Sequence, residues 1–135
     1  RHGTTMDARL RELAILQVGW LAKSPYEWSH HVKIGKDFGV TDDDIYALIA
    51  ESNGEDSGLP GLDRLVLRAA REITNDGAAS AESFAALNDQ MSKEHVVDLT
   101  VTISFYNAVV RFLATLEIDV EDSYQPYLDA FPLPE

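Results

Sequence analysis

The residues best suited to chemistry lie together in KSPYEWSHHVKIGKDFG, residues 23–39, which holds one glutamate and two adjacent histidines. A helix turns by about 100° per residue, so Glu27 and His31 would lie on one face within pairing reach. Ser24 falls on the same face, whereas His30 lies on the opposite flank of Glu27, so spacing alone does not choose between the histidines. A carboxylate beside an imidazole predicts either a proton-transferring pair or half of a metal site.

The same segment also fits a purely structural role. Residues 24–27 read S-P-Y-E, which is the capping-box pattern of a helix start with proline at the favoured first position. In that interpretation Ser24 and Glu27 satisfy backbone N–H groups, Trp28 lies in the core, and the histidines are ordinary helix residues. Glutamate and histidine are often four residues apart on ordinary helices, so the pattern leaves both interpretations open.

The surrounding sequence predicts an all-α fold. Capping residues, helical spacing of apolar residues and terminating turns give expected helices at about 6–23, 24–39, 40–52, 62–75, 80–90 and 93–117. Thr4 or Thr5 is expected to cap the first helix, and Thr41 the third. The stretch LTVTISFY, residues 99–106, alternates like a strand. No turn separates it from the helical NAVVRFLATL, so we assign it to the last helix.

The chain is interpreted as one helical domain, residues 1–117, followed by a C-terminal arm, residues 118–135. A length of 135 residues is enough for a single core. The arm is acidic and contains prolines, which predicts an extended segment lying on the domain or on a neighbouring subunit. The sequence begins with Arg1 rather than methionine, so targeting information before it would not be visible.

Charge and composition exclude several classes of function. The net charge of −12 repels phosphate backbones and anionic lipid, so neither nucleic acid nor a membrane is an expected partner. No apolar run reaches the roughly 18 to 20 residues of a membrane span. The chain has no cysteine, which excludes disulfides, thiolate metal sites and a cysteine nucleophile, and which fits a cytoplasmic location.

Three stretches, RELAILQVGWLAKSPYEWSHHVKIG, GVTDDDIYAL and FYNAVVRFLATLEI, resemble the carboxymuconolactone decarboxylase and alkylhydroperoxidase-D family. The likeness covers nearly the whole chain, and the Y-E-W-x-x-H block is similar to the branch that lacks redox thiols. The peroxidase branch has the pattern E-x11-C-x2-C-x3-H. Placing its histidine on His31 puts its glutamate on Glu12 and its cysteines on Ser24 and Glu27. The resemblance therefore favours His31 over His30.

The resemblance implies an alkylhydroperoxidase-D-like domain of about six helices that assembles as a homo-oligomer, a trimer or a hexamer. It also implies further helix before RHGTT. Both cysteine positions are replaced here, so thiol peroxidase chemistry is excluded. The implied activity is instead proton transfer, decarboxylation or isomerisation, on a small carboxylated substrate such as a lactone or an aromatic-catabolism product, without a cofactor. His31 would be the general acid/base, Glu27 its partner and Glu12 a second pocket carboxylate.

Other residues receive expectations from the same resemblance. The expected substrate-binding residues are Ser24, Tyr26, Trp28 and Arg111, although core packing is the stronger expectation for the two aromatic side chains. An anionic substrate needs cations, and the candidates are Arg9, Arg11, Lys33 and Arg111, each of which fits an ordinary ion pair better. The family's YN block, Tyr106 and Asn107, is expected to pack against the motif helix.

Two other functions remain open alongside the lyase-like enzyme. One is a peroxidase-type activity in which Glu12, Glu27 and His31 hold a metal ion in place of the missing thiols. The other is a non-catalytic binding or assembly protein that has kept the fold and the helix cap.

Overall fold

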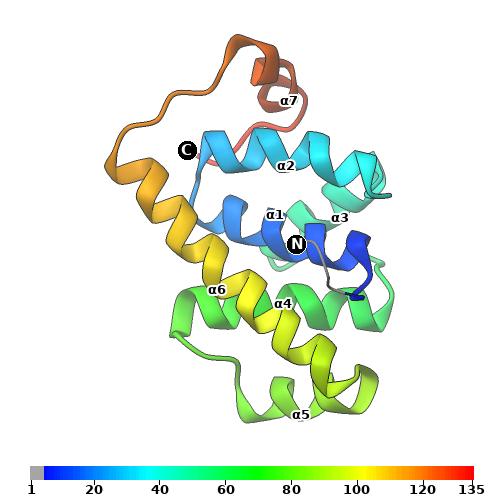
Figure 1. Ribbon diagram of the computed structural model, residues 1–135. Coiled ribbons are helices and arrows are strands. Elements are labelled where there is room, and N and C mark those ends of the chain that lie inside the picture. Colours follow the sequence, from blue (N-terminus) through cyan, green and yellow to red (C-terminus); the bar gives the residue numbers. More distant parts are fainter. Residues whose placement is uncertain (1–4) are drawn as a thin grey trace.

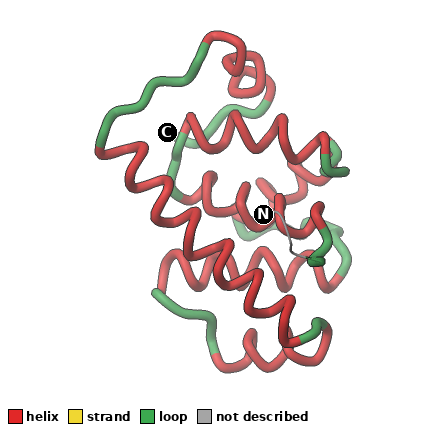
Figure 2. Tube along the Cα trace, viewed as in Figure 1, coloured by secondary structure: helices red, strands yellow, loops and turns green. Residues whose placement is uncertain are grey.

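Seven α-helices and one short 3-10 turn make up the described part of the chain, residues 5–135, in the computed structural model (Figure 1). No strand occurs among these residues, as Figure 2 shows. The elements are α1 Ala8–Leu21, α2 Pro25–Asp37, α3 Asp42–Ser52, α4 Gly61–Asp76, α5 Ala81–Gln90, α6 Lys93–Thr115, η1 Asp122–Tyr124 and α7 Gln125–Ala130. The all-α fold is confirmed, and the strand-like stretch 99–106 is helical within α6.

Helix α1 is the centre of the fold. Every residue from Leu10 to Trp20 is buried, because α2 packs on one side of this helix while α4 and α6 pack on the other (Figure 1). Its apolar residues supply much of the core, but Arg11, Glu12 and Gln17 are buried with them. Buried polar groups are costly unless they are paired. The partners of these three side chains therefore locate the polar interior of the protein.

The first residues of α1 and α3 test the helix caps predicted from the sequence. Thr41 caps α3 as expected, in a full capping box with Asp44. The prediction for α1 is wrong, because Asp7 is its N-cap and accepts a hydrogen bond from the Leu10 backbone N–H at 2.9 Å. Of the two expected caps, Thr4 lies outside the described residues, and the Thr5 hydroxyl contacts the His95 ring at 2.8 Å.

The start of α2 follows only half of the capping-box pattern. The Ser24 hydroxyl accepts a hydrogen bond from the Glu27 backbone N–H, at 3.4 Å. The reciprocal bond is not needed, because the Ser24 backbone N–H already donates to the Gly19 carbonyl of α1 at 3.1 Å. The Glu27 carboxylate is thereby left available for a different partner.

The C-terminal segment differs from the extended arm that its composition predicts. It contains η1 and α7, and α7 packs on α2 (Figure 1). Phe131 is buried, and its carbonyl accepts a hydrogen bond from the Trp28 indole N–H at 2.8 Å. The segment therefore covers the face of α2 that points away from α1. Its treatment as a unit separate from residues 1–117 remains an interpretation.

Candidate active site

Glu12, Glu27 and His31 form a buried cluster between α1 and α2. Glu12 is fully buried on α1, and the other two residues lie one helical turn apart on α2 with 4% and 3% of their surface exposed. His31 Nδ1 lies 2.7 Å from Glu12 Oε2, and His31 Nε2 lies 2.7 Å from Glu27 Oε1. The imidazole ring thus bridges two carboxylates, one from each helix.

The geometry fixes the number of protons in this cluster. Both ring nitrogens lie at hydrogen-bond distance from a carboxylate oxygen, and each such contact requires a proton between the two atoms. A neutral imidazole has one N–H and an imidazolium has two. An imidazolium therefore satisfies both contacts, with one N–H donated to each carboxylate. An imidazole held between two carboxylates is suited to proton transfer.

Arg11 completes the charge balance. Its Nη2 lies 3.6 Å from Glu12 Oε1, its side chain is buried, and its guanidinium lies over the Phe38 ring. Two carboxylates, an imidazolium and a guanidinium have no net charge, which lowers the cost of burying them together. The sequence offered Arg11 as a candidate substrate cation but favoured an ordinary ion pair, and the structure pairs it with Glu12.

The surroundings of His31 raise its pKa. Burial lowers the pKa because it disfavours the charged ring, but the hydrogen bonds that the ring donates to Glu12 and Glu27, together with their negative charges, outweigh burial. The pKa therefore lies above the ordinary value of 6.5. The Tyr106 ring meets the imidazole in an edge-on contact with centroids 5.1 Å apart, which helps to hold its orientation.

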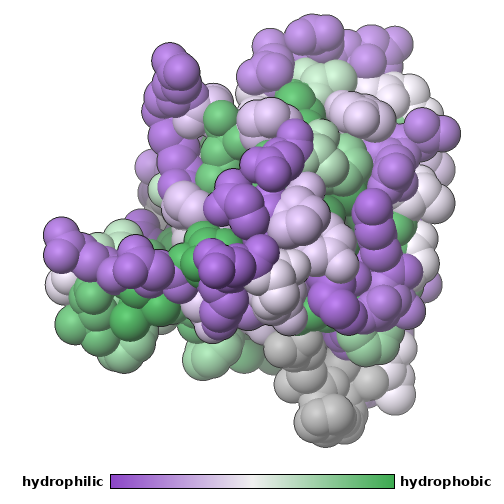
Figure 3. All heavy atoms as spheres, turned by 90° about the horizontal axis from the view of Figure 1, so that it is seen from above, coloured by the Kyte–Doolittle hydropathy of each residue, from purple (hydrophilic) through white to green (hydrophobic). Residues whose placement is uncertain are grey.

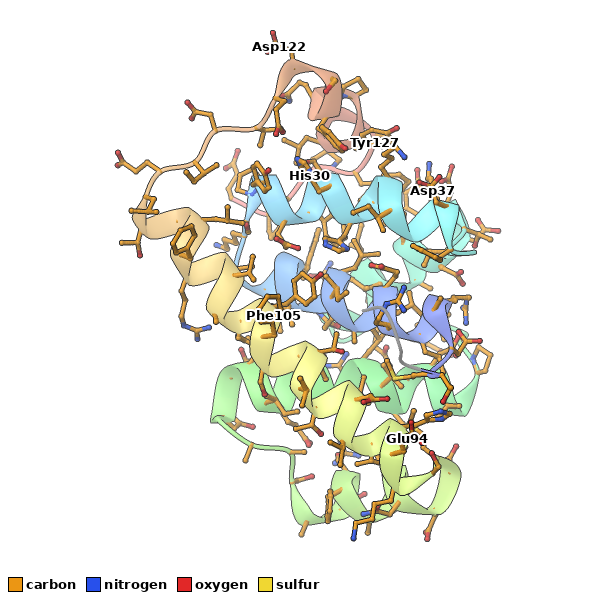
Figure 4. All side chains as sticks on the ribbon, in the orientation of Figure 1. His30, Asp37, Glu94, Phe105, Asp122 and Tyr127 are labelled. Carbon is orange, nitrogen blue, oxygen red and sulfur yellow. The ribbon has the colours of Figure 1, made fainter. Side chains whose placement is uncertain are left out.

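His30 has a different environment. Its ring is stacked between Tyr26, at 4.1 Å, and Tyr124, at 3.7 Å, and its Nε2 lies 2.8 Å from Glu121 Oε2. All these partners except Tyr26 belong to the C-terminal segment, toward which His30 points in Figure 4. His30 therefore fastens that segment to α2.

A family comparison covers the part of the chain that holds this cluster. The model of the carboxymuconolactone decarboxylase family matches residues 2–72, which include all three members of the buried cluster. The chain belongs to the carboxymuconolactone decarboxylase family. Comparison with curated proteins and with solved structures gave no significant match. The resemblance inferred from the sequence is thus confirmed at the level of the family, whereas the branch without thiols remains an interpretation.

The four residues expected to bind substrate do not lie in one pocket. Ser24 and Tyr26 line an open pocket of about 450 Å³ between the α1–α2 turn and the end of α6. Trp28 is fully buried and bonded to the C-terminal segment, so it offers no surface to a substrate in this fold. Arg111 donates to the backbone and side-chain oxygens of Asn107 and lines a different hollow. The structure thus brings two of the four expected residues together.

Sequence reasoning missed the lysine of this pocket. Lys23 lines it beside Ser24, together with two acids, Glu117 and Asp119, from the segment that follows α6. Its backbone has a φ of 51°, a left-handed conformation that is uncommon for lysine, and its Nζ donates to the Glu135 carbonyl at 2.7 Å. The sequence did offer one signal for Lys23. It lies in the short turn between the first two expected helices, where a side chain is exposed to solvent.

The other expected cations are engaged elsewhere. Arg9 bonds Asp44 at 2.7 Å and Asp63 at 2.8 Å, which ties α1 to α3 and α4. Lys33 pairs with Asp37 on the exposed side of α2. These contacts match the ordinary ion pairs that were the stronger expectation for both side chains.

The buried cluster does not fit the metal-dependent alternative. Within residues 5–135 no group of three or more histidine and acidic side chains has an arrangement that could hold a metal ion. The physical reason is that both nitrogens of His31 are already directed at carboxylate oxygens. A metal would have to break one of these contacts to gain a nitrogen ligand.

Proposed function

We propose that this member of the carboxymuconolactone decarboxylase family is an enzyme of the carboxy-lyase type. It would transfer a proton during decarboxylation or isomerisation of a small carboxylated lactone or a related acid. The observation that carries the proposal is the His31 ring held between two buried carboxylates at 2.7 Å on each side. Such a cluster supplies and accepts protons near neutral pH, so the reaction needs no cofactor.

Each residue of the cluster has a distinct task in this proposal. Glu12 accepts the Nδ1 proton, fixes the ring orientation and stabilises the imidazolium. Glu27 receives the Nε2 proton and passes it on, because it directly follows Tyr26, a pocket-lining residue, and its backbone is held by Ser24. Arg11 places a positive charge 3.6 Å from Glu12 Oε1, which balances the charge of the buried carboxylate.

The decarboxylation step balances with this cluster as the acid. The bond between the substrate carbon and its carboxylate breaks, carbon dioxide leaves, and the electron pair stays on the carbon, where the lactone carbonyl delocalises it. One of the two cluster protons then forms the new C–H bond. Water restores the proton to the cluster after the product has left.

The pocket beside Ser24 and Tyr26 is the proposed substrate site. The substrate carboxylate would lie against Lys23 and the N-terminal end of α2, where the helix dipole favours an anion. Glu117 and Asp119, which also line the pocket, would orient it by repulsion. The pocket lining stops at Tyr26, so the proposal requires a local opening between this side chain and α6 before the proton is transferred. A cytoplasmic location is part of the same proposal.

A non-catalytic role is the second candidate, because the cluster is almost inaccessible in this fold. A buried structural ion pair would raise the pKa of His31 as well. The position of the cluster directly behind Tyr26, a pocket-lining residue, supports the enzyme instead.

The direct test is turnover of 4-carboxymuconolactone and related lactone acids, measured as carbon dioxide released. The wild-type protein should be active, whereas His31→Ala and Glu27→Gln should lose activity while retaining the helical circular dichroism spectrum. Lys33→Ala is the matched control, because its exposed pair lies on the same helix outside the cluster. Equal turnover in the wild type and both cluster variants would contradict the proposal, as would a wild type inactive on every lactone acid.

A further inference from the structure

Three arginines of α4 line one pocket, called the arginine pocket below. Arg64, Arg68 and Arg71 follow one another at four and three residues, a spacing that places them on one face of the helix. The pocket has a volume of about 310 Å³ and is completed by the end of α3 and by α5. Helices α4 and α5 lie toward the end of the molecule opposite α7 (Figure 1). The arginine pocket shares no lining residue with the pocket beside Ser24 and Tyr26.

The arginine pocket is a basic region on a strongly acidic protein. Its lining contains three arginines and one acid, Glu51, whereas the whole chain has a net charge of −12. The opposite end of the molecule faces the reader in Figure 3, where hydrophilic side chains cover much of the surface. The C-terminal segment at that end, residues 117–135, contains acids but no lysine or arginine. Small anions are therefore repelled from that end and attracted to the arginine pocket.

Two of the three guanidinium groups are held in place by neighbours. Arg71 Nη1 donates to the side-chain oxygen of Gln17 on α1 at 3.2 Å. Arg68 Nε donates to Glu72 at 3.1 Å, and its Nη2 lies 3.5 Å from Glu82. Side chains that are already ordered lose less entropy when a ligand binds. Arg68 Nη1 and Arg71 Nη2 make no hydrogen bond within residues 5–135, so both arginines keep donors for a ligand.

The third arginine, Arg64, is exposed, and its guanidinium makes neither a hydrogen bond nor an ion pair with another described residue. Glu51, the acid of the pocket, does not occupy the arginines fully. Its buried Oε2 lies 3.7 Å from Arg71 Nη1 and has no hydrogen-bond partner in the described part of the chain. Burial raises the pKa of Glu51, and the positive charges of Arg71 and Arg64 oppose that rise. The pocket therefore offers more N–H donors than its own acid accepts.

A phosphate group matches these donors. It has three terminal oxygens and a charge of about −1.5 to −2 near neutral pH, and a guanidinium binds such oxygens through two parallel hydrogen bonds. Gly61, the first residue of α4, lines the same pocket, and Pro60 before it provides no side-chain cap. The backbone N–H groups at this helix start therefore add to the attraction for an anion. A carboxylate has only two oxygens and one charge, so it would leave one of the arginines unpaired.

The size and the surroundings of the pocket select a small molecule. A phosphate group alone fills only part of the 310 Å³, and the wall also includes Leu65 and Ala86, which suit a short organic group. A nucleic acid would bring further phosphates against the acidic surface outside the pocket, which repels them. We propose that the arginine pocket binds the phosphate group of a small phosphate monoester.

The proposal is tested by isothermal titration calorimetry of the full chain in phosphate-free buffer at neutral pH, with glycerol 3-phosphate as the probe. Arg64→Ala should weaken binding at least about tenfold, because it removes hydrogen bonds to a charged group. Lys33→Ala is the matched control, because it removes one exposed positive charge on α2, and its affinity should stay within roughly twofold of the wild type. A wild type that does not bind the probe, or an Arg64→Ala protein that binds it as tightly as the wild type, would overturn the proposal.

A second pair of variants tests the pocket without changing its charge. Ala86→Phe places a bulky ring in the pocket, whereas Ala85→Phe places the same ring at an exposed alanine of α5 that does not line it. Ala86→Phe should weaken binding of glycerol 3-phosphate at least about tenfold, and Ala85→Phe should bind like the wild type. Both should keep the helical circular dichroism spectrum. Equal affinities of the two variants would contradict the placement of the site.

Three further titrations of the wild type test the chemical class of the ligand. Inorganic phosphate should bind more weakly than glycerol 3-phosphate, acetate more weakly still, and a short DNA duplex should not bind. Acetate that binds as tightly as the probe would contradict the phosphate group, and inorganic phosphate that does so would contradict the organic part. Tighter binding of DNA that is lost in Arg64→Ala would overturn the assignment to a small molecule. None of these measurements involves turnover, so their results do not depend on the proposed function.

Discussion

Two neighbouring histidines of α2 have opposite environments. His31 is buried between α1 and α2, with a carboxylate on each ring nitrogen. His30 points the other way, between two tyrosine rings, with one partially exposed carboxylate as its partner. The helix turn between adjacent residues is enough to assign one ring to the polar interior and the other to the C-terminal segment.

The difference shows that position within the fold, rather than residue type, decides what a histidine can do. The pair around His30 is accessible to water, which screens its interaction and makes it weak. The cluster around His31 is not screened, so its charges and protons depend strongly on one another. We therefore expect changes at His31 to alter chemistry and pH dependence, and changes at His30 to alter attachment of the C-terminal segment.

The largest expected effect is on turnover. His31→Ala removes the group that supplies the proton, and general acid–base catalysis contributes about 10²- to 10⁴-fold. His30→Ala leaves the cluster intact and should change turnover by less than roughly threefold, because no proton of the reaction passes through it. Initial rates of carbon dioxide release measure the turnover of both variants. Equal losses of turnover in the two variants would contradict the different roles given to His31 and His30.

The next effect is on stability. Glu12→Ala leaves His31 and Arg11 in the interior without their common carboxylate, and breaking a buried charged pair costs about 3–5 kcal/mol. Glu12→Gln keeps a hydrogen-bond acceptor and should lose less. Glu121→Ala, the matching change beside His30, should leave the urea midpoint unchanged because water screens that pair. Similar urea midpoints for the Glu12→Ala and Glu121→Ala proteins would show that the buried cluster contributes no more to stability than the exposed pair.

A third effect distinguishes the histidines by pH. The folded-state pKa of His31 is raised above the ordinary 6.5, so its contribution to stability is complete below that pH. It is lost as the pH rises through the folded-state pKa, because the unfolded chain has then already released the proton. The free energy of unfolding should therefore decrease above pH 6.5 in the wild type and decrease less in His31→Gln. An identical slope in both proteins would assign the effect to another group.

The smallest expected effect concerns the C-terminal segment. His30→Ala removes two ring contacts and the bond to Glu121, so residues 118–130 should be cut faster in limited proteolysis. Lys33→Ala, which breaks an exposed pair on the same helix, should not change the cutting rate. Equal rates for the wild type and His30→Ala would mean that the bond between Trp28 and Phe131 holds the segment by itself.

The sequence predicted the helices well because their starts and stops are local signals. It also paired Glu27 with His31, since four residues of a helix bring them together without any tertiary information. The partner across the fold, Glu12, came only from the family resemblance, because a contact between two helices leaves no trace in the spacing. Whether Glu27 caps the helix or belongs to the buried cluster depended on Gly19. The Gly19 carbonyl accepts the hydrogen bond from the Ser24 backbone N–H, so the Glu27 carboxylate is not needed for the cap. No local sequence pattern predicts that bond.

Two other features could not be predicted from local sequence patterns, because they also depend on contacts between distant parts of the chain. Trp28 was correctly weighed as a core residue, but its bond to Phe131 joins residues far apart in the chain. The C-terminal segment has the prolines and acids of an extended arm, yet packing on α2 stabilises short helices there. In the C-terminal segment, tertiary contacts override a weak local preference.

The central claim is that His31 holds its proton between two carboxylates. A pH titration of the imidazole ¹⁵N resonances tests it directly, with the signals assigned by comparison with His30→Ala and His31→Gln. The account predicts that both nitrogens of His31 stay protonated through pH 6.5 and that its midpoint lies above that value. A His31 that loses its proton at or below pH 6.5 would contradict the account.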